Sequence, residues 1–382
     1  MAMRRFLFTS FATASAVSAT PLFQVRRDHP ANALVSRQFA DNSSMFLVYY
    51  GGPVLTKVEV QPIFYGAFAE ETKSTLSSFY SFLTNSEYTD FIADEWSVTG
   101  QKIEHGSVLP SITYSGALVG SLDDATYTKQ LLRNMIKAGT IKPNSNSYYP
   151  IYLGPGVNAT QGSHVACVHF CGYHGTVDIS DISTTTKYLY YAILPDQAGW
   201  CMGGCGDSED PFENLMSISA HEFAEAVTNP AIGVAKSLGS PLSWYLMGYG
   251  ETGDILTHTH EKTSAHTGNT IQETMTDTVT GKTWVVQKLW SNKYQMCMSQ
   301  SPSNKAAKIA PSSDTAVTTS KSPINSAVTS KSSSSVNAAP KPAISKPAYV
   351  KTTKAAKTTK KSTTTKKTTT KKAAVKTTTK KK

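Results

Sequence analysis

Three residues that could perform metal chemistry lie close together in the stretch Ser219–Pro230. His221 and Glu225 are four positions apart, so on a helix they lie on one face, one above the other. Glu222 lies beside them, within reach of a water molecule that the other two could hold. Metallohydrolases of the H-E-x-x-H type use this order of metal ligand, general base and metal ligand. The last position is Glu in this chain, so the H-E-x-x-E pattern predicts a site for zinc, or for another divalent cation, with a more acidic shell.

The helix that carries this motif has clear start and stop signals. Asp210 can cap its start, Pro211 suits the first helical position, and Glu213 is placed for a capping box. Asn229-Pro230 ends it. Its other side chains are largely apolar, so the His and Glu residues must be hydrogen-bonded, hydrated or metal-bound once the helix is buried. The alternative interpretation is a capped core helix whose polar residues bond only to their neighbours.

A later acidic pair could complete the metal site. Glu251 and Asp254 follow the helix after enough chain for a loop and a return. Either carboxylate could be the third ligand of a site that keeps one position open for water. An ordinary polar turn among glycines is the alternative. His258 and His260, in the polar loop that comes next, are rival ligands.

Two functions are compatible with these residues. In the first, the protein is a zinc-dependent, peptidase-like hydrolase of zincin-like form that acts on a peptide or polymer substrate. Glu222 would then take a proton from a bound water as the water attacks a carbonyl group. In the second, the protein is not an enzyme, and the helix is structural or holds a stabilising ion. The chain has no G-x-S-x-G elbow, phosphate loop or dinucleotide fingerprint, which argues against serine hydrolase, kinase or dehydrogenase chemistry.

Apolar periodicity predicts the elements that must position these residues. Besides the motif helix, helices are expected over residues 71–83 and 123–138, and strands over 58–65, 149–153, 187–194 and 282–290. The segment Asn85-Ser86-Glu87 is typical of a turn. Because strands and helices mix without a strict βαβ rhythm, the predicted fold class is α+β, with a single mixed sheet-and-helix domain.

Four of the five cysteines lie in one region, as two C-x-x-x-C pairs: Cys167, Cys171, Cys201 and Cys205. With His169 and His174 between the pairs, a zinc knuckle is conceivable. Structural zinc sites prefer other spacings, however, and a secreted chain oxidises its thiols, so two disulfides are the favoured interpretation. The sequence does not determine which cysteines pair, and Cys297 is the remote fifth.

Composition divides the chain into four segments. Residues 1–19 combine a basic start, an apolar stretch and small residues at the end, which predicts a signal peptide cleaved after Ala19. Residues 20–45 form a pro-segment or linker, and residues 46–300 form the globular domain. No later run of about 18 apolar residues predicts a membrane span. The N-x-[ST] sequons at Asn42 and Asn158 are glycosylation candidates of a secreted protein.

Residues 301–382 form a tail that consists almost wholly of Ser, Thr, Ala, Pro and Lys. It contains 19 lysines, no arginine and one acidic residue, Asp314, while the whole chain has a net charge of +10. The rest of the chain is therefore acidic. Such a tail cannot bury a core and is expected to be disordered. By charge alone it could bind anionic cell-wall polymers or other polyanions, although secretion argues against nucleic acid. A solvated, O-glycosylated stalk is the alternative.

Several blocks of the sequence together resemble the exordium family, also called phosphate-induced proteins. The most specific is H-E-F-A-E-A-V-T-N-P at 221–230; weaker ones are G-G-P-V-L-T at 51–56, C-G-Y-H-G at 171–175, C-M-G-G-C at 201–205 and G-E-T-G-D at 250–254. The resemblance is to a fungal-type member, here with a Lys/Thr-rich tail.

This resemblance implies a secreted, extracellular or cell-wall-associated protein linked to growth, and it implies location and fold better than a reaction. Where the family usually has a cysteine after its acidic pair, this chain has Leu256. The resemblance therefore implies that Cys297 has lost its usual disulfide partner. Under this resemblance, the non-enzymatic alternative is a cell-wall or extracellular-matrix protein that is tethered through its tail.

Deleting residues 301–382 should abolish association of the protein with anionic cell-wall polymers, because the deleted segment carries the basic charge. Cosedimentation with an anionic polysaccharide measures this. Raising the salt concentration should weaken binding of the intact chain, since exposed charges are screened. Unchanged association after the deletion would count against tethering by the tail.

Overall fold

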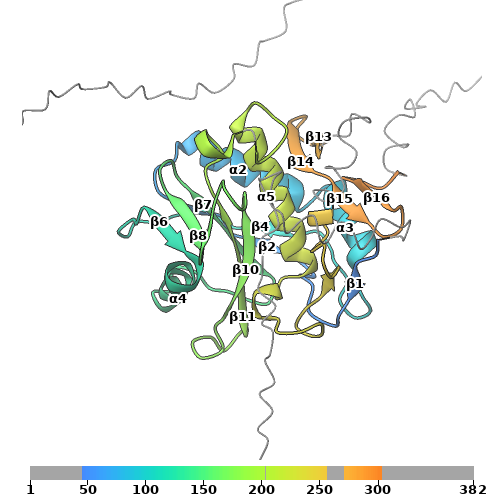
Figure 1. Ribbon diagram of the computed structural model, residues 1–382, viewed down its shortest axis with the longest axis horizontal. Coiled ribbons are helices and arrows are strands. Elements are labelled where there is room, and N and C mark those ends of the chain that lie inside the picture. The colour runs from blue at the N-terminus through green and yellow to red at the C-terminus, as the bar shows by residue number, and fades with distance from the viewer. Residues whose placement is uncertain (1–44, 203, 256–270, 303–382) are drawn as a thin grey trace, which may run out of the picture. The chain divides into compact units, whose positions relative to one another are not determined.

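The computed structural model describes residues 45–202, 204–255 and 271–302 (Figure 1), and it combines a central sheet with helices on both faces. The α+β prediction is confirmed. The predicted signal peptide, most of the linker, the sequon at Asn42, the rival ligands His258 and His260, and nearly all of the tail lie outside the described residues. Within the described residues no helix has the length and apolar character needed to cross a membrane.

The largest sheet has seven strands, and most of them run parallel. Its main path is β10-β11-β7-β2-β4, and β3 pairs with both β7 and β5. Only β10, at one edge, is antiparallel to its neighbour β11. These strands are β2 (Glu59–Val60), β3 (Ile63–Tyr65), β4 (Ser107–Val108), β5 (Ile112–Thr113), β7 (Ser147–Leu153), β10 (Tyr173–Asp178) and β11 (Tyr188–Leu194).

The strand β7 shows why this sheet is buried on both faces. Tyr148 and Tyr152 belong to the hydrophobic core on one face, whereas Tyr149, Ile151 and Leu153 belong to the core on the other. Successive strand residues point to opposite faces, so a strand covered on both sides becomes a continuous apolar run. The sequence Ser-Tyr-Tyr-Pro-Ile-Tyr-Leu of β7 has this character, and all of its residues are buried.

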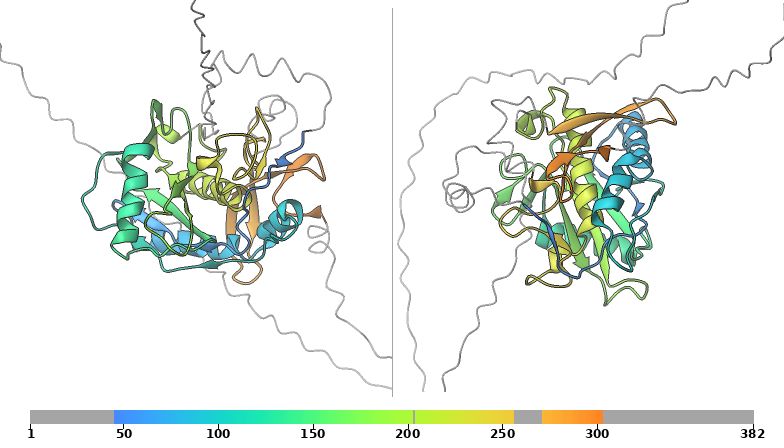
Figure 2. Two further views of the ribbon diagram at one scale, coloured as in Figure 1. Left: turned by 90° about the horizontal axis from the view of Figure 1, so that it is seen from below. Right: turned by 90° about the vertical axis from the view of Figure 1, so that its right-hand side faces the viewer.

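The helices divide between these two cores (Figure 2). On one face lie α2 (Glu70–Leu83), α3 (Glu87–Trp96) and α5 (Pro211–Thr228). On the other face lies α4 (Lys129–Lys137), which follows the π-helical turn η1 (Asp124–Thr128). The short 3-10 turns are η2 (Gly199–Cys201) and η3 (Ile232–Val234).

The helix α5 starts and ends where its signals predict. The side chain of Asp210 accepts a hydrogen bond from the Phe212 backbone N–H at 2.9 Å. Glu213 does not close the capping box; it accepts from the hydroxyl of Ser208, which also accepts from the Asp210 N–H. The body of α5 is buried from Asn214 to Thr228, so the helix lies inside the protein.

Smaller sheets surround this core. They contain β1 (Val48–Tyr49) with β12 (Trp244–Tyr245), β13 (Gln272–Thr276) with β14 (Thr283–Gln287), β15 (Leu289–Ser291) with β16 (Met296–Met298), and β6 (Ser121–Asp123) with β8 (Asn158–Gln161) and β9 (His164–Val165). The hairpin strand β14 packs along α5. Asn158 is half-buried on β8, and its glycosylation stays a prediction.

Three predicted elements differ in detail from the structure. The strand predicted over 58–65 is divided into β2 and β3 by Gln61-Pro62, where proline has no N–H to donate. The strand predicted over 282–290 is likewise divided, at Lys288, into β14 and β15. The turn predicted at Asn85-Ser86-Glu87 is the start of the unpredicted helix α3, whose N-cap Ser86 accepts from the Tyr88 N–H.

Candidate functional site

Six ionisable side chains from three chain segments meet beside the edge of the main sheet. All of them are 6% exposed or less. His174 comes from β10, three of the others come from α5, and the last two come from the loop that follows β12. The α5 and loop residues are His221, Glu222, Glu225, Glu251 and Asp254. The structure therefore brings together all four predicted metal ligands and the predicted general base.

His221 and Glu225 face each other along α5, as their spacing predicts. The Nε2 atom of His221 lies 3.2 Å from Glu225 Oε2 and 3.7 Å from Asp254 Oδ1. The loop carboxylate thus approaches the same nitrogen of this imidazole as Glu225 does. These three side chains form one group whose ligand atoms lie within 4.8 Å of one another.

His174 is the member of the site that the spacing of residues on the motif helix did not reveal. Its Nδ1 atom lies 3.4 Å from Glu222 Oε2 and 3.6 Å from Glu225 Oε2, and its Nε2 atom lies 3.5 Å from Glu251 Oε1. With Glu225 and Glu251 it forms a second possible ligand group. The available signal was its place in the C-G-Y-H-G block at 171–175, between the two cysteine pairs.

The separations within the site match the geometry of metal ligands. Charge-assisted hydrogen bonds have N···O distances of about 2.7–2.9 Å. Ligand atoms about 2.0–2.2 Å from a tetrahedral zinc ion lie about 3.3–3.6 Å from one another. In the group of His221, Glu225 and Asp254, the distances from His221 Nε2 to the two carboxylate oxygens are 3.2 and 3.7 Å, on either side of the second range. The residues therefore fit a divalent cation better than a network of direct ion pairs.

Asn229, the residue that ends α5, positions the loop that carries the two late carboxylates. Its Nδ2 donates to Glu251 Oε1 at 2.9 Å, and its Oδ1 accepts from the Ser243 N–H at 2.7 Å. Glu251 also turns the loop on itself, because its N–H donates to Asp254 Oδ2 at 2.9 Å. The helix stop predicted from Asn229-Pro230 is thus also a support of the site.

Gly253 allows the loop to approach α5 closely. Its N–H donates to Glu225 Oε1 at 3.1 Å, and its carbonyl accepts from Gln287 Nε2 on β14 at 2.8 Å. A Cβ atom at this position would lie 2.4 Å from His221 Nδ1 and 3.0 Å from Glu225 Oε1. No side chain larger than hydrogen fits there without movement of the two ligands.

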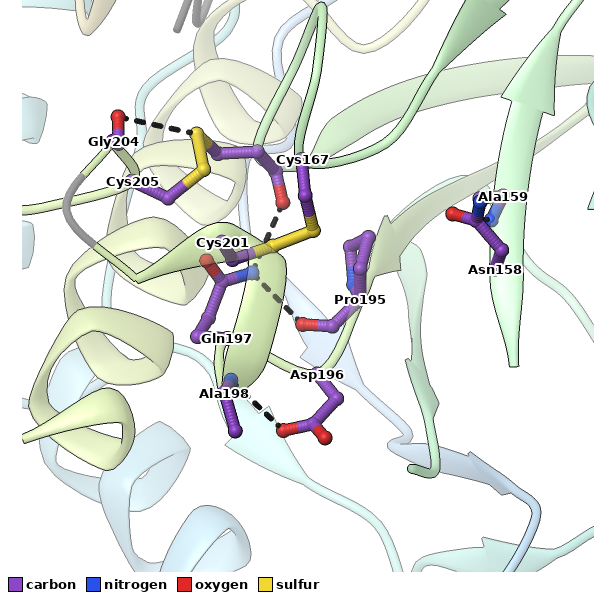
Figure 3. The surroundings of a disulfide bond; sticks show 11 residues. Asn158, Ala159, Cys167, Pro195, Asp196, Gln197, Ala198, Cys201, Gly204 and Cys205 are labelled. Carbon is purple, nitrogen blue, oxygen red and sulfur yellow. Dashed lines mark hydrogen bonds between the residues drawn. A yellow bond between two sulfur atoms is a disulfide. The ribbon is translucent and has the colours of Figure 1, made fainter. Parts of the chain in front are cut away.

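The four clustered cysteines form two disulfides, Cys167–Cys201 and Cys171–Cys205, which confirms the favoured interpretation and excludes the zinc knuckle. The bonds and their neighbour Gln197 are drawn in Figure 3. Gln197 donates to the carbonyl of Cys171 at 3.1 Å. Because Cys171 lies three residues before His174, this region anchors the strand that carries the imidazole. Cys297 is a free cysteine, as predicted.

The electrostatics of the site are dominated by its excess of carboxylates. Burial alone would lower the pKa of His221, but the carboxylates of Glu225, Glu222 and Asp254 outweigh it and raise this pKa to about 10. For Glu225, burial raises the pKa, and the effect of His221 and His174 outweighs it, so the pKa of Glu225 is lowered. Glu225 and His221 thus favour each other's charged forms.

The two loop carboxyls behave in the opposite way. Burial, and then the charge of Glu225, raise the pKa of Glu251 and of Asp254 well above their ordinary values. Such shifts mark a site that holds protons in place of a missing positive charge. A divalent cation would supply that charge, so the donor set and the charge balance both suit a metal ion.

Tyr245 on β12 is half-buried, and the carboxylates of the centre act on its phenol. Burial, followed by the charges of Glu251, Asp254 and Glu225, raises the pKa of its phenol. Its hydroxyl group therefore remains protonated at neutral pH.

Comparison with known proteins gives one distant relative. Over 228 residues the chain is 24% identical to Protein EXORDIUM-like 5 from Arabidopsis thaliana, and the match covers 52% of this chain and 61% of the plant protein. The chain thus spans less than two thirds of the length of that relative. No family model matches the chain, and no solved structure matches it. The similarity supports the resemblance to the exordium family.

Replacing Gly253 by alanine should lower the free energy of unfolding by about 1–3 kcal/mol, because the added methyl group overlaps His221 and Glu225. Urea unfolding measures the change. The matched control is Gly120→Ala, where a Cβ atom meets nothing within 4 Å; its effect should stay within about 0.5 kcal/mol. Equal effects of the two changes would contradict the close approach.

The metal-free protein should lose stability as pH rises from 6.5 to about 10. The raised pKa of His221 means that the stability it contributes is fully present below pH 6.5 and is lost as pH rises through about 10. The raised pKa values of Glu251 and Asp254 act in the same direction, since the folded state holds protons that the unfolded chain releases. The lowered pKa of Glu225 changes the stability only at pH values below the ordinary pKa of 4.5.

Urea unfolding in the presence of a chelator, at several pH values, tests this expectation. His221→Asn should reduce the decline in stability above pH 6.5. His164→Asn, which removes an exposed histidine on β9, should preserve the decline. A free energy of unfolding that stays level or rises between pH 6.5 and 10 would contradict the expectation.

Proposed function

We propose that this chain is an extracellular exordium-like protein that holds zinc in its buried centre and uses it to hydrolyse a peptide or polymer substrate. The observation that carries the proposal is the convergence of His221, Glu225 and Asp254 into one ligand group, with Glu222 next to it on the same helix. Two imidazoles and four carboxylates are rarely gathered in a protein interior without a cation, since buried charges are costly unless they are paired.

Two findings support the extracellular location. The chain is similar to a plant exordium-like protein, a resemblance that implies secretion. Two disulfides are present, and such bonds persist in oxidising environments.

His221 and Glu225 would hold the ion from one face of α5, and Asp254 or Glu251 would hold it from the loop. When bound, zinc would polarise a substrate carbonyl and make a bound water more acidic. Glu222 would receive the proton of that water. One of its oxygens, Oε2, is 3.4 Å from His174 Nδ1, and the other lies against Gly172, where an added Cβ atom would be 3.1 Å away. His174 and Gly172 are therefore the neighbours of this carboxylate on the side of β10.

The burial of the centre favours a second candidate, in which the same residues hold an ion for stability alone. Every one of these side chains is 6% exposed or less, as in structural metal sites. In this case the protein acts non-enzymatically at the cell wall or in the extracellular matrix. Its lysine-rich tail, with 19 lysines, would tether it to anionic polymers, and nucleic acid is not an expected partner.

Elemental analysis of the purified protein tests whether a metal is held at all. The wild-type protein should retain zinc after gel filtration, and the double variant His221→Ala, Glu225→Ala should lose it. Zinc that is absent from a well-folded wild-type protein, even after zinc has been offered, would overturn both forms of the proposal.

The variant Glu222→Gln should separate the two candidates. In the enzyme it should keep zinc and lose about 10²–10⁴-fold in turnover, because the amide cannot accept the proton of the attacking water. Glu71→Gln on the exposed side of α2 is the matched control and should retain full turnover. Assays on a peptide library and on wall polysaccharides supply the readout. Undetectable turnover by the zinc-loaded wild type on all of these substrates would favour the structural ion, and unchanged turnover in Glu222→Gln would remove this residue from the mechanism.

A further inference from the structure

We propose that the centre is dinuclear, with a second divalent cation held by His174, Glu225 and Glu251 next to the first. The inference rests on the proposed function, because it takes for granted that the first ion binds to His221, Glu225 and Asp254. It adds a second ion, two ligands for it, and a bridging role for Glu225.

The two ligand groups of the site overlap at a single residue. In each group the three ligand atoms lie within 4.8 Å of one another, and Glu225 is the member common to both. Its Oε2 atom is 3.2 Å from His221 Nε2 and 3.6 Å from His174 Nδ1. Glu225 therefore lies between the two imidazoles, which is where a carboxylate that bridges two ions must be. Ions in two-metal hydrolytic sites are about 3.5–4 Å apart, a spacing that one shared carboxylate spans.

His174 has the environment of a metal ligand that lacks its metal. Its Nε2 atom is buried and makes no hydrogen bond within the described parts of the chain, although it points at Glu251 Oε1 from 3.5 Å. A buried polar atom without a partner is costly. The alternative is an imidazolium that bonds directly to Glu222 and Glu251. Such charge-assisted bonds would be about 2.7–2.9 Å long, shorter than the observed 3.4 and 3.5 Å.

The charge of the centre, when all of its carboxyls are ionised, is also matched by two divalent cations. Glu222, Glu225, Glu251 and Asp254 carry four negative charges when they are ionised, and one divalent cation neutralises two of them. The ion pairs of Glu222, Glu225 and Glu251 within the described residues are all with histidine, a neutral side chain when it binds a metal. Two divalent cations would bring the buried cluster to zero net charge and remove the cost of unpaired ionised groups.

The support of the second group is as rigid as that of the first. His174 lies on β10, in register with Ala192 of β11, and three residues after the disulfide-bonded Cys171. Glu251 is held by Asn229 at 2.9 Å. A strand, a helix and an anchored loop thus hold the three side chains already within 4.8 Å of one another.

The proposal is tested by counting ions in the full-length protein. The protein is stripped with a chelator, saturated with zinc, desalted, and measured by elemental analysis. Wild type should hold two zinc ions per chain, and His174→Ala should hold one. The matched control His169→Ala, which removes an exposed histidine of the same region, should hold two. Near-UV circular dichroism shows whether each variant is folded.

In a second measurement, cobalt(II) replaces zinc in the wild-type protein. The result therefore does not depend on the folding of a variant. Two cobalt ions joined by one carboxylate couple magnetically, so the second equivalent should add much less electron paramagnetic resonance signal than the first. Equal signal from each equivalent would mean that the ions are apart and would overturn the dinuclear centre.

The outcomes distinguish the failure of this inference from the failure of the proposed function. If folded wild-type protein binds no zinc, both the proposed function and this inference fail. One zinc ion in wild type and in His174→Ala leaves the proposed function intact and overturns the second ion. Two ions in wild type and two in folded His174→Ala place the second ion elsewhere and also overturn the inference.

Discussion

The rest of this structure depends on one constraint: four carboxylates and two imidazoles share a space from which water is nearly excluded. Carboxylates repel one another strongly in such surroundings, and histidine protons compensate only part of the charge. The pKa shifts express this imbalance, since His221 gains a proton readily while Glu251 and Asp254 resist losing theirs. A divalent cation resolves the same imbalance with ligand geometry that is already in place.

The architecture holds these groups together against their repulsion. The helix α5 is buried over most of its length and carries three of the groups, so none of them can turn toward solvent. The loop is fixed to α5 through Asn229 and Gly253, and β14 supports it from behind. The sheet edge supplies His174. Each of these supports is a hydrogen bond or a close backbone approach. Together they set the distances between the ionisable side chains of the site.

Sequence reasoning predicted the parts of the site that depend on local spacing. The i, i+4 relation of His221 and Glu225, the N-cap Asp210 and the acidic pair Glu251 and Asp254 are all short-range patterns, and the structure reproduces them, although the capping box with Glu213 does not form. The α+β class, two disulfides and the main strands β7 and β11 were also predictable. The role of His174 was not, because it depends on which strand forms the edge of the sheet beside α5. Pairing of the cysteines is equally a property of the tertiary fold. The helix α3 was missed since its N-cap, Ser86, resembles a turn residue when it is read alone.

The disulfide Cys171–Cys205 links the approach to β10 with the approach to α5, and so relates two ligand-bearing elements by a covalent bond. Disulfides form in oxidising compartments and stay open in the reducing cytosol. In a newly made chain, therefore, the strand that carries His174 lacks this tie to the start of the motif helix until the thiols are oxidised. The tie forms only under oxidising conditions, so the placement of His174 relative to the motif helix is coupled to the redox state of the compartment in which the chain folds.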